Sequence, residues 1–285
     1  MKKKIVLIGL DTFGKKHLSE LRRSDYFELV GVCDLKKCDD FGRFSFFYDI
    51  EYMFASTKPQ AVIIATPPKT HKEIILKCMK YVKFIFVKTP FAQSVEHARQ
   101  MRYLSNSNNA KIAVSFNDRF NPVAISLLKE LQKEDRIYSI NIIRSKKCDD
   151  ISDLILNDLD LVRVLSKSEI NSFDMKKVTY SKNLSVAHCV LKTKNEILVN
   201  ICSNLFYPDD KAYIEICATN GVYLADLVEL SLYKIAKNSR INLRVDRDDF
   251  SIRFEHKEFF NICNGLESKS LADIEDVVRI REILK

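Results

Sequence analysis

The sequence predicts an α/β protein, with a doubly wound parallel sheet at its N-terminus and a second α/β domain whose open sheet is mostly antiparallel. In the first part, short buried-strand runs alternate with helical stretches, as in parallel sheets covered by helices. The second sheet is expected to begin at 137–143, and after a helix that carries Asp153 the segments from 174 to 227 follow one another at the spacing of an antiparallel meander. We expect a first domain at 1–117 and a second at 118–285, with the last helices either there or packed back on the first.

The strands of the first part are predicted from continuous apolar runs, which are typical of strands buried on both faces. The run Ile5 to Ile8 is the clearest of them. The remaining strands are expected at 27–33, 44–48, 61–65, 84–87 and 112–114, and helices at 14–23, 71–79 and 94–105.

The loop after the first strand, residues 9–14, reads G-L-D-T-F-G. It matches the dinucleotide-binding frame G-x-G-x-x-G except at the middle glycine. Gly9 permits the tight turn, and Gly14 permits close packing of helix against strand. The loop therefore predicts a Rossmann fold more strongly than it predicts cofactor binding.

Asp11 stands where the middle glycine would let the backbone approach a pyrophosphate. Two like charges about 4 Å apart repel by roughly 4 kcal/mol at an effective dielectric near 20. Two ways to relieve this repulsion stay open. Asp11 can turn outward, or Lys15 or Lys16 can partly neutralise it.

Asp34 ends the second strand, 20 residues after Gly14. A carboxylate at this place hydrogen-bonds the ribose hydroxyls of a dinucleotide, and a strand-terminal turn residue is the alternative. Lys36 and Lys37 beside it would suit a 2′-phosphate, so the choice between NAD and NADP stays open.

Further motifs follow in a fixed order: A-T-P-P-K-T-H at 65–71, V-K-T-P-F-A at 87–92 and N-D-R-F-N-P at 117–122. D-L-I-L-N-D-L-D-L at 153–161 and A-T-N-G-V at 218–222 complete the series. The series resembles the glucose-fructose oxidoreductase / inositol dehydrogenase / MocA-like (Gfo/Idh/MocA) family along nearly the whole chain.

The resemblance implies NAD or NADP as cofactor, a sugar, nucleotide-sugar or cyclitol as substrate, and a homodimer or homotetramer built through the second sheet. His71 matches a family position at a helix start, where a structural hydrogen-bonding role is the alternative. The residues implied to hold the cofactor are Gly9, Asp11, Thr12, Phe13, Gly14, Asp34, Thr66, Pro67 and His71.

Two departures fall on the family's reacting centre. Where the family has E-K-P, this chain has Lys88, Thr89 and Pro90. Threonine cannot supply the positive charge that polarises a reacting hydroxyl. Lys88 is adjacent, but neighbouring strand residues point to opposite faces, so it could serve only if the strand end twists.

The second departure lies on a predicted helix, where Asp153 and Asn157 share one face because they are four residues apart. The family's general base is a histidine at the later position, and an asparagine cannot act as a base. Asp153 could orient a sugar hydroxyl or simply face the helix dipole. No other histidine clearly replaces the base, and His256 is expected at the surface.

Two functions therefore stand side by side. One is an NAD(P)-dependent oxidoreductase acting on a sugar-like hydroxyl, with Asp153, Asn157 and either Lys88 or Thr89 at the reacting centre. The other is a catalytically inactive relative that is retained as a ligand- or protein-binding scaffold.

Composition excludes other classes. The net charge of +8 comes from basic residues spread along the chain, without a nucleic-acid-binding motif. No apolar stretch approaches the roughly 20 residues that span a bilayer, and the N-terminal run is too short for a signal peptide, so we expect a cytoplasmic protein without membrane contact. None of the eight cysteines forms a C-x-x-C pair, so no metal site is expected.

Overall fold

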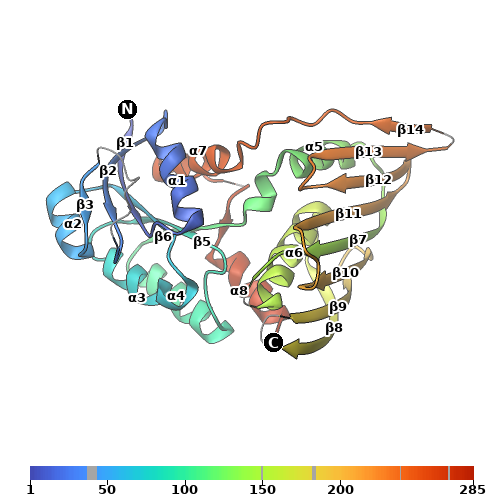
Figure 1. Cartoon of the computed structure of the whole chain (residues 1–285), viewed down its shortest axis with the longest axis horizontal. Helices are drawn as coiled ribbons and strands as arrows, with labels where there is room; N and C mark the ends of the chain where they lie inside the picture. The colour runs from blue at the N-terminus through green and yellow to red at the C-terminus, as the bar shows by residue number, and fades with distance from the viewer. Residues whose placement is uncertain (37–43, 149, 182–183, 238, 269) are drawn as a thin grey trace. The chain divides into compact units, whose positions relative to one another are not determined.

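A computed structural model describes residues 1–36, 44–148, 150–181, 184–237, 239–268 and 270–285 (Figure 1). The chain divides into two compact units, each described here by itself. The first unit comprises residues 1–117, 252–283 and 285, and the second comprises 118–251 and 284. The closing pair of helices thus belongs to the first unit, which leaves the second unit without a C-terminal helical pair.

The first unit is built on a seven-stranded sheet with the order β15-β6-β5-β4-β1-β2-β3. Strands β1 to β6 run parallel, and β15 pairs antiparallel with β6. The doubly wound parallel sheet expected from the sequence is therefore present. Its strands are β1 (Lys3–Ile8), β2 (Phe27–Cys33), β3 (Phe46–Phe47), β4 (Ala61–Ile64), β5 (Phe84–Lys88), β6 (Lys111–Ser115) and β15 (Ala272–Asp273).

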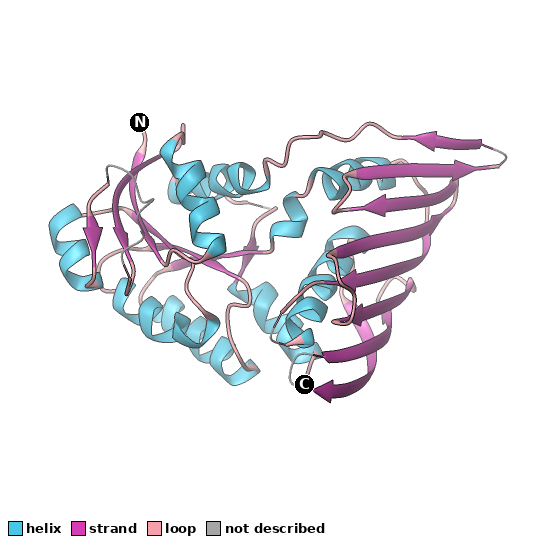
Figure 2. Cartoon of the chain, in the orientation of Figure 1, coloured by secondary structure: helices cyan, strands magenta, loops and turns pink. Residues whose placement is uncertain are grey.

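Helices cover this sheet, as Figure 2 shows. The central strands β1 and β4 are almost entirely buried, because their continuous apolar runs have neighbours on both faces. The helices are α1 (Thr12–Arg22), α2 (Ile50–Thr57), α3 (Pro68–Cys78), α4 (Val95–Ser107), α7 (Ser251–Cys263) and α8 (Ile274–Ile283).

The turn between β1 and α1 requires both of its glycines. Gly9 has φ +97, and a Cβ there would lie 2.7 Å from the carbonyl carbon and oxygen of Ala65. A Cβ on Gly14 would lie 2.2 Å from the carbonyl oxygen of Gly9. Both contacts are with backbone and cannot be relieved by a side-chain movement, so packing requires both glycines, and the positive φ of Gly9 is a second requirement at that position.

The second unit is built on an eight-stranded sheet with the order β14-β13-β12-β11-β7-β10-β9-β8. Helices α5 (Pro122–Leu131) and α6 (Ile151–Ser166) contact its strands. A short 3-10 turn at Asn117–Phe120 precedes α5 in the chain. Its strands are β7 (Ile137–Ser145), β8 (Ile170–Ser181), β9 (Leu184–Thr193), β10 (Leu198–Asn204), β11 (Lys211–Ala218), β12 (Gly221–Asp226), β13 (Ser231–Ala236) and β14 (Ser239–Asn242).

The sheet is mostly antiparallel, as expected, but it is not the simple meander that the strand spacing predicted. β7 lies between β10 and β11, and β7 and β10 run parallel. After β7 the chain passes through α6 to β8 at the edge of the sheet and returns through β9 to β10. Strand β10 therefore pairs with β9 and β7, and β7 separates it from β11. Strands β13 and β14 extend the sheet beyond the predicted segments.

Candidate functional site

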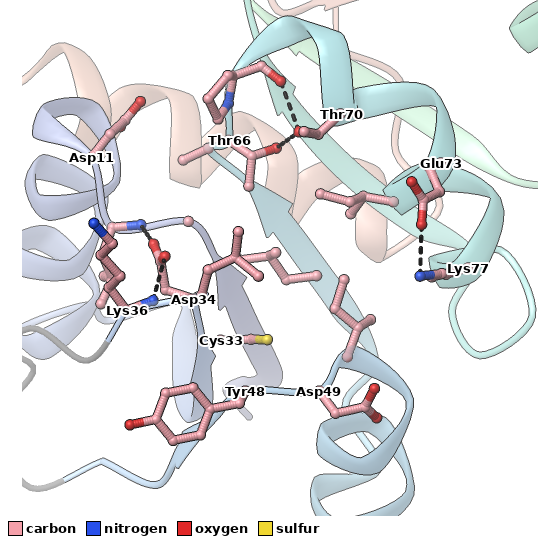
Figure 3. Close-up of a pocket in the computed structure, with 18 of the residues that line it drawn as sticks. Asp11, Cys33, Asp34, Lys36, Tyr48, Asp49, Thr66, Thr70, Glu73 and Lys77 are labelled. Atoms are coloured by element: carbon pink, nitrogen blue, oxygen red, sulfur yellow. Dashed lines mark hydrogen bonds and ion pairs between the residues drawn. The ribbon is translucent and has the colours of Figure 1, made fainter.

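A cavity of about 830 Å³ lies at the carboxyl ends of β1, β2 and β4 (Figure 3). Its size falls within the range of small-molecule sites, and ligands of parallel α/β sheets bind at this edge. The cavity belongs entirely to the first unit. Its polar lining includes Asp11, Lys15, Asp34, Lys36, Tyr48, Asp49, Thr66, Thr70, Glu73 and Lys77.

Asp34 lies at the start of the loop after β2 and lines this cavity. Its Oδ2 accepts a hydrogen bond from the backbone N–H of Leu10 at 2.6 Å, and its Oδ1 accepts one from that of Lys36 at 3.2 Å (Figure 3). A carboxylate has about four lone-pair positions, so it keeps acceptor capacity for a ligand hydroxyl. Asp34 thus ties the glycine loop to β2 and also faces the cavity. Lys37 lies outside the described residues.

The loop after β4 forms the opposite wall. Thr70 donates a hydrogen bond to the Thr66 hydroxyl at 2.8 Å, and it also lies 2.8 Å from the carbonyl oxygen of Pro67. His71, which is buried, lies beneath this loop, with Nε2 2.8 Å from the Thr66 carbonyl and Nδ1 3.2 Å from that of Phe91. Desolvation by burial lowers the pKa of His71, although the backbone carbonyl groups around the ring oppose this shift, and the ring lies between the two loops. Thr66 and Pro67 line the cavity, and His71 supports them.

Asp11 does not turn outward. It is the N-cap of α1, and its Oδ1 accepts hydrogen bonds of 2.9 Å each from the backbone N–H groups of Phe13 and Gly14. These are amides at the positive end of the helix, where Rossmann folds bind a ligand phosphate. In this chain a side-chain carboxylate already occupies them.

The cation that contacts Asp11 is Lys88, at the end of β5. Its Nζ forms an ion pair with Asp11 Oδ2 and lies 5.9 Å from the centre of the Phe13 ring. In the described part of the chain, therefore, Lys88 neutralises Asp11, in place of the helix lysines Lys15 and Lys16 considered from the sequence. The two departures from the family motifs at Asp11 and Lys88 contact each other.

Thr89 and Pro90 follow Lys88 and are joined by a cis peptide bond. The Thr89 backbone N–H donates to the Ser115 carbonyl oxygen at 3.3 Å, which continues the pairing of β5 with β6. Thr89 carries no charge, so it cannot take the part of the family's lysine.

Asp153 and Asn157 lie one turn apart on α6 in the second unit, and both are half-buried. Their shared face follows from the helix that the sequence predicted. Asn157 has no basic group, so this position cannot accept a proton from a substrate hydroxyl. The part of Asp153 and Asn157 in a reacting centre stays a prediction.

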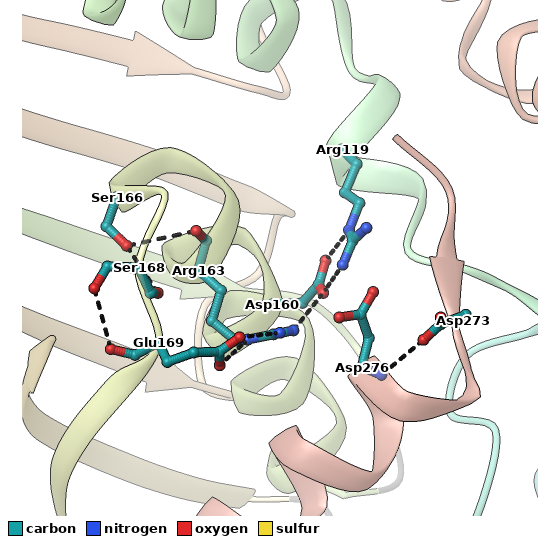
Figure 4. Close-up of polar contacts among 8 residues, drawn as sticks. All are labelled: Arg119, Asp160, Arg163, Ser166, Ser168, Glu169, Asp273 and Asp276. Atoms are coloured by element: carbon teal, nitrogen blue, oxygen red, sulfur yellow. Dashed lines mark hydrogen bonds and ion pairs between the residues drawn. The ribbon is translucent and has the colours of Figure 1, made fainter. Parts of the chain in front are cut away.

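The later aspartates of the same motif are held by arginines within the second unit. Asp160 accepts two hydrogen bonds from Arg119, at 2.7 and 2.5 Å, and Arg163 next to it pairs with Glu169 at 2.8 Å (Figure 4). These contacts fix α6 against the segment before α5 and against the start of β8. They assign Asp160 a structural role.

Asp158 is fully buried and accepts from Arg144 Nε at 2.9 Å and from Nη2 at 2.6 Å. Arg144 also pairs with Asp118 at 2.9 Å. Burial raises the pKa of Asp158 to about 6 although Arg144 opposes the shift. Asp118 and Asp158 lie in the motifs at 117–122 and 153–161, but the sequence analysis did not single out Arg144, because only the tertiary fold brings the three residues together.

His256 is not at the surface, contrary to the expectation from the sequence. Both His256 and His17 are buried to 0% exposure, and His17 Nδ1 lies 2.8 Å from His256 Nε2. The local sequence pattern could not predict that His256 is buried, because the helix that covers it is α1, more than 200 residues earlier in the chain.

Within the described residues, no three His, Cys, Asp or Glu side chains are grouped so that they could hold a metal ion. Among the same residues, no helix is both long and apolar enough to cross a bilayer.

Comparison with known proteins finds its family match within the first unit. Residues 3–116 match the family model Gfo/Idh/MocA, described as an oxidoreductase family with an NAD-binding Rossmann fold. The chain is 29% identical over 126 residues to 4-carboxy-2-hydroxymuconate-6-semialdehyde dehydrogenase of Sphingobium sp. (strain NBRC 103272 / SYK-6). It is 25% identical over 134 residues to inositol 2-dehydrogenase of Rhizobium meliloti (strain 1021). Each alignment spans 42% of this chain and 40% of the relative.

The likeness in fold extends over both units. A structure of UDP-N-acetylglucosamine 3-dehydrogenase GnnA from Acidithiobacillus ferrooxidans superposes with a TM-score of 0.86 over 99% of this chain and 95% of that one, at 18% identity. At this identity the likeness shows the fold alone. The family match itself is confined to the Rossmann domain at residues 3–116, which is similar to the NAD-binding domain of the Gfo/Idh/MocA oxidoreductase family.

Proposed function

We propose that this protein binds a nucleoside-type ligand in the crevice of its Rossmann domain and does not carry out its family's hydride transfer. This is the second of the two functions considered from the sequence. The observation that carries it is the Asp11 carboxylate on the amide groups of Phe13 and Gly14. Those two amides are the donors that a dinucleotide pyrophosphate requires.

NAD or NADP fits one half of the crevice and not the other. At the adenosine end, the cavity and Asp34 suit a ribose with two adjacent hydroxyls. At the pyrophosphate end, the ligand would meet the Asp11 carboxylate instead of a glycine backbone. The crevice therefore favours the adenosine half of a dinucleotide and disfavours its pyrophosphate.

The residues for the reaction itself are also altered. Oxidation of a hydroxyl requires an acceptor for its proton, and polarisation of that hydroxyl requires a fixed charge. Thr89 and Asn157 supply neither of these functions. The change at both positions supports a binding role.

A second candidate, an NAD(P)-dependent oxidoreductase acting on a sugar, nucleotide-sugar or cyclitol hydroxyl, is favoured by the position of Asp34 in the cavity wall. Under this alternative, a bound dinucleotide displaces Asp11, and Asp153 orients the substrate.

Titration of the purified protein separates the two functions. NADH and NADPH are followed by nicotinamide fluorescence, and adenosine by calorimetry. We expect saturable binding of adenosine and no saturable binding of either dinucleotide up to millimolar concentration. Micromolar binding of NADH or NADPH would contradict the proposal and favour the oxidoreductase.

A further inference from the structure

The Asp11 carboxylate makes the two kinds of contact that a bound anion makes, one with backbone amides and one with a cation. One oxygen accepts from the two backbone amides at the start of α1, and the other contacts the ammonium group of Lys88. A phosphate bound at a helix N-terminus accepts from backbone amides in the same way, and phosphates in general also bind nearby cations. Asp11 is therefore placed as an internal substitute for a phosphate group.

Lys88 is positioned for this contact by the fold and not by chance at a mobile surface. It is the last residue of β5, and its side chain is only 15% exposed. Its ammonium group also lies 5.9 Å from the centre of the Phe13 ring, the residue whose amide Asp11 caps. Asp11, Phe13 and Lys88 thus form one cluster, which we call the loop cluster.

The loop cluster has no excess positive charge, because the carboxylate of Asp11 balances the ammonium group of Lys88. An incoming phosphate would find both amides used and would lie beside a carboxylate, which repels it. A ligand that ends in an uncharged hydroxyl at this point meets neither obstacle.

We infer that the loop cluster takes the place of a ligand phosphate, so that the crevice selects nucleosides over their 5′-phosphates and over dinucleotides. The preference for nucleosides rests on the proposed function. The closure of the phosphate position rests only on the contacts of Asp11.

The test compares the full-length protein with Asp11→Gly, which frees both amides and removes the negative charge. The probes are inorganic pyrophosphate, AMP and adenosine, each measured by isothermal titration calorimetry. We expect Asp11→Gly to bind pyrophosphate and AMP at least tenfold more tightly than the wild type, and adenosine with an affinity within twofold. Adding Lys88→Met to Asp11→Gly removes most of that gain, because the freed lysine contacts the phosphate.

Asp49→Gly is the matched control. Asp49 also lines the cavity and also caps a helix, with Oδ1 accepting from Tyr52 N–H at 2.7 Å, but it lies at the start of α2. Its replacement should leave pyrophosphate binding unchanged. Thermal melting of each variant verifies that it is folded before titration.

Three outcomes overturn the inference: pyrophosphate binds the wild type as tightly as it binds Asp11→Gly, it binds neither protein, or Asp49→Gly gains as much as Asp11→Gly. A different result separates the two proposals. If pyrophosphate binding rises in Asp11→Gly while neither protein binds adenosine, the proposed function fails together with the preference for nucleosides, and the closure of the phosphate position by Asp11 stands.

Discussion

His17 Nδ1 and His256 Nε2 lie 2.8 Å apart in the interior of the first unit, and the two imidazole rings stack at 5.1 Å between centroids. One histidine comes from α1 and the other from α7, so this contact joins the N-terminal Rossmann helix to the penultimate helix of the chain. Phe86 of the sheet lies at the edge of the His17 ring. A neutral pair can share one N–H between the two nitrogens, whereas a charged pair cannot remain buried there.

The histidine pair makes the fold sensitive to acid. Burial lowers the pKa of His256 from 6.5 to about 3, and burial together with the charges of His256 and Lys88 lowers the pKa of His17. Above pH 6.5 these histidines are neutral in both the folded and the unfolded protein, so they do not make the stability depend on pH. As the pH falls below 6.5, the unfolded chain binds protons that the folded chain refuses, so stability falls down to about pH 3.

We expect His256 alone to cost about 2 kcal/mol of unfolding free energy between pH 7 and pH 5. The double variant His17→Leu/His256→Leu should lose this part of the pH dependence, as measured by urea unfolding at several pH values. His97→Leu, a half-buried histidine on α4, is the control and should unfold with the wild-type pH dependence. An unchanged slope in the double variant would show that the pair is not the acid-sensitive element.

Arg144 is the only counter-charge in the described part of the chain that touches the fully buried carboxylate of Asp158. Arg144→Met leaves that charge unpaired, and removal of one partner of a buried pair costs about 3–5 kcal/mol. We expect a loss of this size at pH 7 in urea unfolding.

The loss should shrink toward pH 5. The pKa of Asp158 is already raised to about 6, and without Arg144 the carboxyl group takes up a proton more readily. Asp158→Asn added to Arg144→Met should restore part of the stability at pH 7. A loss below about 1 kcal/mol for Arg144→Met would contradict the assignment of this pair as a structural element.

Asp34 has two tasks, because it faces the cavity and accepts from Leu10 N–H. Asp34→Ala should weaken adenosine binding at least tenfold in calorimetry, through loss of the acceptor for the ribose hydroxyls and through a looser glycine loop. Glu73→Ala is the matched control. Its carboxylate lines the same cavity from α3 but pairs with Lys77 at 2.8 Å, and its loss should change the affinity by less than threefold. Equal effects of both variants would remove Asp34 from the site.

One face of the second unit's sheet carries exposed apolar side chains. Val178, Val190 and Leu198 are 53%, 56% and 56% exposed, and the strand registers put all three on the same face. We expect the protein to form homodimers or homotetramers through this face, since association would remove these exposed apolar side chains from water. Light scattering on a sizing column should show an oligomer for the wild type and a smaller species for Val190→Arg.

Val228→Arg is the control for this prediction. Val228 is 45% exposed but lies in the turn after β12, away from the face formed by β8 to β10. The prediction fails if the wild type is a monomer at micromolar concentration, or if both variants dissociate it equally.

Pattern reading was sufficient for the architecture of the first unit. The short continuous runs at β1, β4 and β5 are typical of strands buried on both faces, and their alternation with helices implies a parallel sheet. Gly9 could be assigned to the tight turn and Gly14 to close packing from the frame of the loop alone, and the positive φ of Gly9 and the Cβ contacts of the folded chain agree. These features depend on neighbours in sequence, which is why the sequence reports them.

The site depended on contacts between distant residues, which no local pattern contains. The sequence showed that Asp11 and Lys88 both depart from the family motifs. It did not show that these two residues, 77 positions apart, contact each other. The same holds for His17 with His256, and for the place of β7 between β10 and β11. Composition and periodicity establish which residues a strand or helix buries. Only the packed fold establishes which buried or charged groups become neighbours, because that choice is made by strand order and by helix packing across the whole chain.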